Sequence, residues 1–153
     1  MIYEESLEYL KNKQFIEAIE NLEKLVREDK NNYKVWIAKG IAYGQIGDIA
    51  KALQDFSKAI EIDKFRVEAY LNRINIFMQN KEFKEALSDL SFILENIEKS
   101  ADIYYKRAIV YSQNAQVDEA LNDLERVLKI DENHQDAKND KAMLLRFKEN
   151  FKK

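Results

Sequence analysis

The sequence repeats itself with a period of 34 residues, and this period limits the possible folds more than any other feature. An alanine recurs in register, with an aromatic or β-branched residue three positions before it and a large apolar residue four positions after it. The four alanines are Ala18, Ala52, Ala86 and Ala120. Because the register never slips, each period is expected to form the same structure and to bury its apolar face against its neighbours.

Each period carries the pattern of two amphipathic helices. Its apolar residues follow i, i+3, i+4 and i+7 spacing twice, separated by a short break. With no proline and only three glycines in 153 residues, few points force a helix to stop. The predicted helices cover residues 2–12, 15–28, 33–46, 49–62, 67–79, 83–97, 101–114, 117–130 and 135–151. The sequence therefore predicts an all-α fold.

Short polar residues mark the predicted turns. An asparagine recurs at the end of the first helix of three hairpins, where a residue that tolerates left-handed backbone is favoured: Asn12, Asn80 and Asn114. The second hairpin has Gly47 one position later, followed by Asp48. We expect Asp48 to be the N-cap of the next helix.

Residues 36–56 contain W-x2-K-G-x2-Y followed by A-x3-F, and this segment resembles the tetratricopeptide repeat motif. The resemblance implies a right-handed α-solenoid in a single domain over residues 1–153. It implies four helix hairpins at 1–32, 33–66, 67–100 and 101–134 and a C-terminal capping helix at 135–151. The chain departs from the motif by lacking its usual proline and by replacing a usual leucine with Lys39, Arg73 and Arg107.

These three cations are each followed, 16 residues later, by an aspartate: Asp55, Asp89 and Asp123. The first hairpin lacks both charges, so the cation and the aspartate occur or disappear together. This pattern favours an ion pair between the two helices of a hairpin over a row of ligand-binding cations. We expect partly exposed pairs that contribute about 0–1 kcal/mol each. The recurring alanines are interpreted as points of closest helix approach, where a larger side chain would overpack.

The usual catalytic and metal-binding constellations are missing from the sequence. There is no cysteine, and His134 is the only histidine, so neither a His–His metal pair nor a Ser-His-Asp arrangement can form within one chain. The three glycines, Gly40, Gly44 and Gly47, follow no predicted strand and make no phosphate-binding loop. We predict no catalytic residue, no metal and no cofactor, and therefore no enzyme.

Charge and hydropathy predict the type of partner. The net charge is −3 with acids and bases interleaved, which lacks the basic field that nucleic acid binding needs. No run approaches the roughly 18 apolar residues of a membrane span, so we expect no membrane insertion. The absence of cysteine and an N-terminus with glutamates where a signal peptide would be basic predict a cytoplasmic protein.

The resemblance also implies a concave groove lined by the first helix of each hairpin. The predicted partner-binding residues are Tyr3, Leu7, Ile37, Ile41, Gln45, Leu71, Asn75, Met78, Tyr105 and Ile109. An apolar groove rimmed by amides suits an extended or helical peptide of another protein, unless these residues only cover one another. A clamp for an acidic chaperone tail is disfavoured because only Asn72 and Lys106 match it in kind and Asp102 would repel a carboxylate.

The last predicted helix carries an apolar stripe at i, i+4 and i+8: Met143, Phe147 and Phe151. Ala142 and Leu145 are expected to keep the packing register of a repeat. The stripe is either part of the groove, a self-association surface that makes a homodimer, or a simple cap. The predicted function is accordingly a scaffold or adaptor that binds a protein or peptide. The alternatives are a structural homo-oligomer and a peptide-sensing regulatory module, which would need an output domain.

Overall fold

The protein is all-α across residues 2–150, the part of the chain that this computed structural model describes. The helices in this range are α1 (Ile2–Lys11), α2 (Phe15–Glu28), α3 (Tyr33–Gln45), α4 (Ile49–Ile62), α5 (Val67–Gln79), α6 (Phe83–Asn96), α7 (Ala101–Gln113), α8 (Val117–Ile130) and α9 (Gln135–Asn150). The predicted helices are confirmed. Four of them, α1, α3, α6 and α7, end one residue earlier than predicted, and residue 151 of the last one lies outside the described range.

The helices fall into two compact units, Met1–Gln79 and Asn80–Lys153, called unit 1 and unit 2 below. Unit 1 contains α1 to α5 and unit 2 contains α6 to α9. The boundary lies between α5 and α6, inside the predicted third hairpin. A single domain over residues 1–153 stays a prediction.

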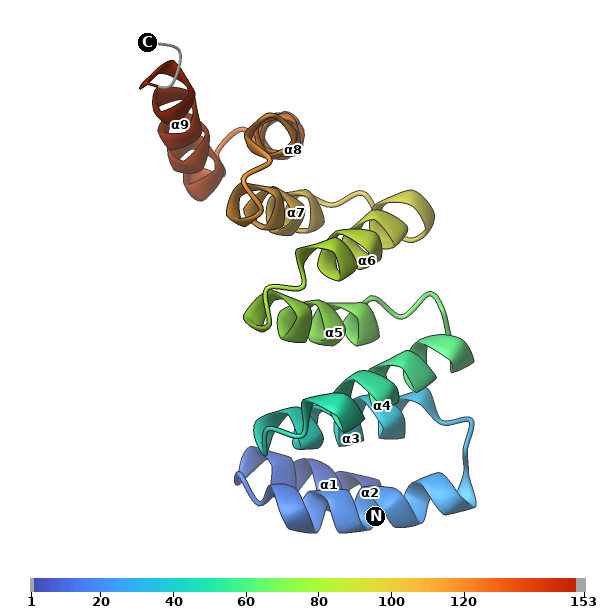
Figure 1. Cartoon of the computed structure of the whole chain (residues 1–153). Helices are drawn as coiled ribbons and strands as arrows, with labels where there is room; N and C mark the ends of the chain where they lie inside the picture. The colour runs from blue at the N-terminus through green and yellow to red at the C-terminus, as the bar shows by residue number, and fades with distance from the viewer. Residues whose placement is uncertain (1, 151–153) are drawn as a thin grey trace. The chain divides into compact units, whose positions relative to one another are not determined.

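Unit 1 is built from the hairpins α1–α2 and α3–α4, with α5 packed on α4 and α3 (Figure 1). The recurring Ala18 and Ala52 have no exposed surface, as expected for positions where helices approach most closely. Gly40 faces the buried ring of Phe56, and a Cβ added at Gly40 would lie 2.7 Å from the Cε1 atom of that ring. The small residue on α3 and the large ring on α4 therefore fit each other.

Unit 2 is built around the hairpin α7–α8, with α6 packed on α7 and α9 packed on α8. Its last helix is buried through Ala137 and Leu144. The prediction that Ala142 and Leu145 pack is wrong, because Ala142 is exposed and Leu145 is 43% exposed. In α7, the residues in these two slots face the second helix of their own hairpin. No such helix follows α9 within the described residues, so the same slots face outward.

The turns inside the hairpins place one residue in left-handed backbone. It is the residue after each predicted asparagine: Lys13, Lys81 and Ala115, with φ values of 59°, 59° and 58°, in register with Gly47 at 82°. The prediction that the asparagines themselves take this conformation is wrong. In the first hairpin the N–H of Gln14 donates to the carbonyl of Tyr9 at 2.8 Å. This bond closes the end of the helix when the residue directly before Gln14, Lys13, is left-handed.

The predicted N-cap is confirmed. The Asp48 side chain accepts a hydrogen bond from the N–H of Lys51 at 3.2 Å, at the start of α4. This bond satisfies one of the helix donors that lack a partner in the first turn.

Candidate functional site

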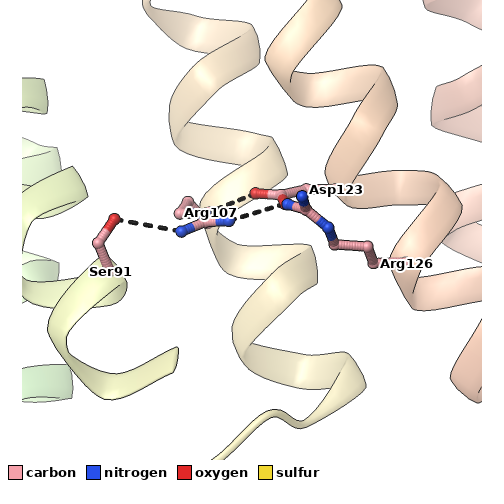
Figure 2. Close-up of polar contacts among 4 residues, drawn as sticks. All are labelled: Ser91, Arg107, Asp123 and Arg126. Carbon is pink, nitrogen blue, oxygen red and sulfur yellow. Dashed lines mark hydrogen bonds and ion pairs between the residues drawn. The ribbon is translucent and has the colours of Figure 1, made fainter. Parts of the chain in front are cut away.

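The repeated ion pairs were one candidate for a ligand site, and their geometry shows that they join helices. Lys39 Nζ lies 3.2 Å from Asp55 Oδ1 in unit 1. In unit 2, Arg107 donates to both oxygens of Asp123, from Nε at 2.6 Å and from Nη2 at 2.9 Å (Figure 2). The aspartate side chains are 5% and 1% exposed, so the expectation of partly exposed pairs is wrong. Interhelical pairing is confirmed in both units.

The two pairs differ in how completely they satisfy the aspartate. Asp123 accepts from Arg107 and also from Arg126 Nη1 at 2.6 Å (Figure 2). Asp55 meets only the single ammonium of Lys39, and its Oδ2 atom is buried without a hydrogen-bond partner among the described residues. Burial raises the pKa of Asp55 to about 6, against the opposing effect of Lys39. The pair in unit 1 is therefore the weaker one.

A cleft of about 320 Å³ lies between α3 and α5 in unit 1, with α4 beneath it. It is called the α3–α5 cleft below. Its lining residues are Gly40, Ile41, Gly44, Gln45, Ile49, Phe56, Asn72, Asn75, Ile76 and Gln79. No charged side chain is among them. Phe56 and Ile76 are buried, whereas Gln45, Asn75 and Gln79 are exposed. The apolar residues are thus the floor of this cleft, and side-chain amides are its exposed surface.

The exposed amides of this cleft have unused hydrogen-bonding groups. The side chains of Gln45, Asn75 and Gln79 make no hydrogen bond to other described residues. The Asn72 Nδ2 atom donates to the carbonyl of Glu68 at 2.9 Å, which leaves its own carbonyl oxygen as an acceptor. The carboxamides of Gln45, Asn75 and Gln79 therefore each have two N–H donors and one carbonyl acceptor available for a ligand.

Gly44 keeps the α3–α5 cleft open. A Cβ added there would meet Ala52 and Ile76 at 3.9 Å, which is ordinary van der Waals contact. The core accepts a side chain at this place, unlike at Gly40, so packing does not require glycine. The consequence of Gly44 is a deeper cleft and bare helix backbone at its floor.

A pocket of about 140 Å³ occupies the equivalent place in unit 2, two periods later in the sequence. It lies between α7 and α9 and is called the α7–α9 pocket. It is lined by Ala108, Ile109, Ser112, Gln113, Leu124, Asp140, Met143 and Leu144. Three replacements change its chemistry: Ser112 stands for Gly44, Asp140 for Asn72 and Met143 for Asn75.

The rim of the α7–α9 pocket is acidic. Asp140 Oδ2 accepts a hydrogen bond from the Tyr105 hydroxyl at 2.8 Å. Burial, followed by this bond and by the charges of Asp140 and Asp136, raises the pKa of Tyr105 to about 12. The ring of His134 contacts that of Tyr105 at a tilt of 47°, with centroids 4.7 Å apart, and its Nδ1 atom accepts from the N–H of Ala137 at 3.2 Å. The single histidine therefore caps α9.

The structure brings together some of the predicted groove residues. Ile41, Gln45 and Asn75 line the α3–α5 cleft, and Ile109 lines the α7–α9 pocket beside Met143, which the sequence assigned to self-association. Tyr105 lies at the rim of that pocket through Asp140. Tyr3, Leu7, Leu71 and Met78 line neither of the two.

Other predicted site residues are placed elsewhere. Ile37 is 3% exposed and belongs to the core of unit 1, so including it among the partner-binding residues was wrong. Phe147 is 50% exposed and borders a separate hollow with Val117 and Lys148. Phe151 lies outside the described residues.

Sequence reasoning considered Asn72 only as part of a disfavoured chaperone-tail clamp, and it did not consider Asp140 at all. Both occupy the sixth slot of a first helix, which the assumed groove pattern leaves out. Asn72 lines the α3–α5 cleft and Asp140 lines the α7–α9 pocket because each opening lies between the first helices of two successive repeats. Their equal distance from the repeat start was the signal that could have found them.

The described residues also bear on metal binding and membrane insertion. Within residues 2–150, no three His, Cys, Asp or Glu side chains gather in a way that could hold a metal ion. None of the described helices combines the length and the hydropathy that crossing a membrane needs.

Solved structures define the class of fold. A tetratricopeptide repeat protein from Parabacteroides merdae ATCC 43184 matches with a TM-score of 0.88 and 21% identity, over 99% of this chain and 60% of that one. MamA 41-end from Desulfovibrio magneticus RS-1 gives 0.82 and 20%, over 99% and 85%. YrrB, described as a TPR protein with an unusual peptide-binding site, gives 0.67 and 24%, over 81% and 64%. The fold is the tetratricopeptide type, as predicted.

The family follows from the sequence. The family model of the ETO1 C-terminal domain matches residues 5–145, and the chain belongs to this family. No curated protein matches the sequence.

Proposed function

We propose that this chain is a protein-interaction module that binds an extended peptide segment of a partner protein in the α3–α5 cleft. The observation that carries this proposal is the set of three exposed amides, Gln45, Asn75 and Gln79, without hydrogen-bond partners in the described chain. A carboxamide offers a donor and an acceptor together, which matches the N–H and C=O groups of an extended main chain.

The spacing and the charge of the cleft support the same type of ligand. Asn75 and Gln79 are four residues apart on α5, about 6 Å along the helix axis. This is close to the distance of about 6.8 Å between alternate residues of an extended strand. Because the lining carries no charged side chain, an uncharged stretch enters without losing the solvation of an ion. The floor of Ile41, Ile49 and Phe56 adds apolar contact.

The test starts from peptides that the wild-type chain selects from a random short-peptide library, with affinity measured by calorimetry. The double variant Asn75→Leu/Gln79→Leu should bind them about tenfold more weakly, since it loses two hydrogen bonds of about 0.5–1.5 kcal/mol each. The matched control is Asn122→Leu, which removes an exposed amide on α8 that lines neither the α3–α5 cleft nor the equivalent opening in unit 2 and should leave affinity unchanged. Unchanged affinity of the double variant would contradict main-chain recognition in this cleft.

A structural homo-oligomer joined through α9 is the second candidate, favoured by the exposure of apolar residues on that helix. Met143 is 58% exposed, and Leu145 and Phe147 are exposed beside it in the sequence. Light scattering over a wide concentration range, with wild type and Leu145→Ser/Phe147→Ser, tests it. A wild-type dimer that the substitutions dissociate supports the homo-oligomer, and a monomer at all concentrations removes it.

The remaining sequence-based hypotheses stay predictions. These are the cytoplasmic location, the absence of catalysis, cofactor and nucleic acid, and the regulatory role as a peptide sensor.

A further inference from the structure

The α7–α9 pocket has a chemistry that the α3–α5 cleft lacks. Along its wall the amide of Asn75 is replaced by the thioether of Met143, and the floor is made of Ala108, Leu124 and Leu144. With Ile109 these residues make most of the lining apolar, and the polar lining residues are Ser112, Gln113 and Asp140. The pocket has one side-chain amide, that of Gln113, where the cleft has four, so it offers fewer groups for main-chain recognition.

The size of the pocket suits one apolar side chain. Its volume is about 140 Å³. A cavity of roughly 150 Å³ lined by aliphatic side chains holds benzene, so a leucine, isoleucine, methionine or phenylalanine side chain is of the right size. Met143 is 58% exposed at the wall, and a flexible thioether adapts to apolar groups of different shapes.

The rim adds a charge requirement. Asp140 Oδ2 is held by the Tyr105 hydroxyl, and Oδ1 makes no hydrogen bond to another described residue. Asp136, one turn earlier on α9, adds a second negative charge that acts on Tyr105. No lysine or arginine lines the pocket. A cationic side chain that approaches this rim therefore meets a carboxylate without an internal counter-ion in the lining.

We propose that the α7–α9 pocket binds an apolar side chain of a partner peptide that carries a lysine or arginine within two residues of it, with the cation paired to Asp140. This proposal rests on the proposed function as a peptide-binding module, but it uses residues of unit 2 alone. The peptide that binds the α7–α9 pocket differs in charge from the one that binds the α3–α5 cleft, because the cleft has no carboxylate that could pair with a cation.

The proposal is tested with a capped peptide of Ser and Thr that carries one Leu and one Arg at alternate positions. Binding is followed by NMR titration of the full chain, with the methyl signals of Ile109 and Met143 as reporters. Replacing the peptide's Leu by Ala should weaken binding about tenfold, because a buried leucine side chain is lost. Replacing its Arg by Gln should weaken binding about two- to fivefold, as for a solvent-accessible ion pair.

The protein variant that decides the matter is Asp140→Asn. It keeps an acceptor for the Tyr105 hydroxyl and removes the charge that pairs with the cation. Combined with Asp136→Asn, which removes the second negative charge of the rim, it should bind the Arg and Gln peptides equally. Persistence of the preference for Arg, or titration shifts that avoid Ile109 and Met143, would overturn the proposal. A wild-type dimer that Met143→Ser dissociates, and that blocks the peptide, would also overturn it and assign the pocket to a second copy.

The unit 1 double variant Asn75→Leu/Gln79→Leu separates this proposal from the proposed function. It should bind the Leu–Arg peptide as wild type does. If the α7–α9 pocket fails its test while the α3–α5 cleft passes, only the present inference is lost.

Discussion

The α3–α5 cleft and the α7–α9 pocket lie at the same place of the repeat in two different units. Comparing them shows which lining residues stay the same and which differ. Ile41 and Ile109 are the same residue type in that slot, as are Gln45 and Gln113. The other lining slots differ, and the opening changes from an uncharged amide cleft of about 320 Å³ to a mainly apolar pocket of about 140 Å³ with an acidic rim. A helical repeat can thus change the chemistry of its openings without changing how it folds.

The ion pairs of the two units also differ in chemistry while they join equivalent helices. Arg107 satisfies both oxygens of Asp123, whereas Lys39 leaves Asp55 Oδ2 without a partner among the described residues. A planar guanidinium matches a carboxylate in two places and an ammonium acts as a point charge. Both pairs join the same two helices of a hairpin, but with different strength.

The largest expected effect comes from breaking the stronger pair. Arg107→Met should lower the free energy of unfolding by about 3 kcal/mol, because it leaves the buried Asp123 with Arg126 alone. Lys39→Met should cost less, since Asp55 is already under-satisfied and can take up a proton near pH 6. Urea unfolding of both variants at neutral pH measures the difference. Equal losses would show that the two pairs are equivalent.

A pH dependence of stability is expected from Asp55. Its folded pKa of about 6 lies above the ordinary 3.8, so the native state takes up a proton before the unfolded chain does. The resulting stability is fully present below about pH 4 and is lost as the pH rises through about 6, and the shift corresponds to about 3 kcal/mol. Wild type should therefore gain stability relative to Asp55→Asn between pH 7 and pH 4.5.

Two controls sharpen this measurement. Hydrogen bonds from Lys51 and from Arg66 lower the pKa values of Asp48 and Asp63, so their contributions are lost only at more acidic pH. Lys39→Arg, which supplies the second donor that unit 2 has, should flatten the curve between pH 4.5 and 7. A curve that is unchanged in Lys39→Arg would assign the effect to another group.

The small residue on the first helix and the large residue on the second helix of a hairpin should be replaceable only together. Gly40→Ala places a methyl group against Phe56 and should destabilise the chain by about 2 kcal/mol. Phe56→Leu in the same chain should recover most of this loss, because unit 2 combines Ala108 with Leu124 in these slots. Gly44→Ala is the matched control and should be tolerated. Thermal unfolding checks all three, and failure of the double variant to recover would place the clash elsewhere.

The smallest expected effect is a transfer of specificity. Asn72→Asp with Asn75→Met gives the α3–α5 cleft the charge and thioether of the α7–α9 pocket. The amide-selected peptides should bind this variant several-fold more weakly, and a preference for Arg over Gln of about two- to fivefold should appear in unit 1. Calorimetry with both peptide types measures this exchange. No change in preference would mean that slots outside these two decide recognition.

Sequence reasoning located the elements well and the binding surfaces less well. The helices, the Asp48 cap and the cation–aspartate pairing follow from patterns that recur at fixed spacing. The surface list included Ile37, which is buried, and left out Asn72 and Asp140, which line the two openings. The exposure of these side chains depends on how the neighbouring hairpin covers them. The residue pattern within one hairpin carries no information about that covering.

The amino-acid sequence by itself determined the 34-residue period, the helical hairpins and the partners across each hairpin, because these depend on local spacing and on which residues occur together. The tertiary structure decided which face of α9 packs. Ala142 and Leu145 keep the repeat spacing, yet they are exposed because no second helix covers them within the described residues. It also decided that the residue in left-handed backbone is Lys13 and not Asn12, because the Gln14 to Tyr9 hydrogen bond fixes which residue closes the helix. Burial and turn closure depend on what lies opposite in space, and a periodic sequence does not specify that.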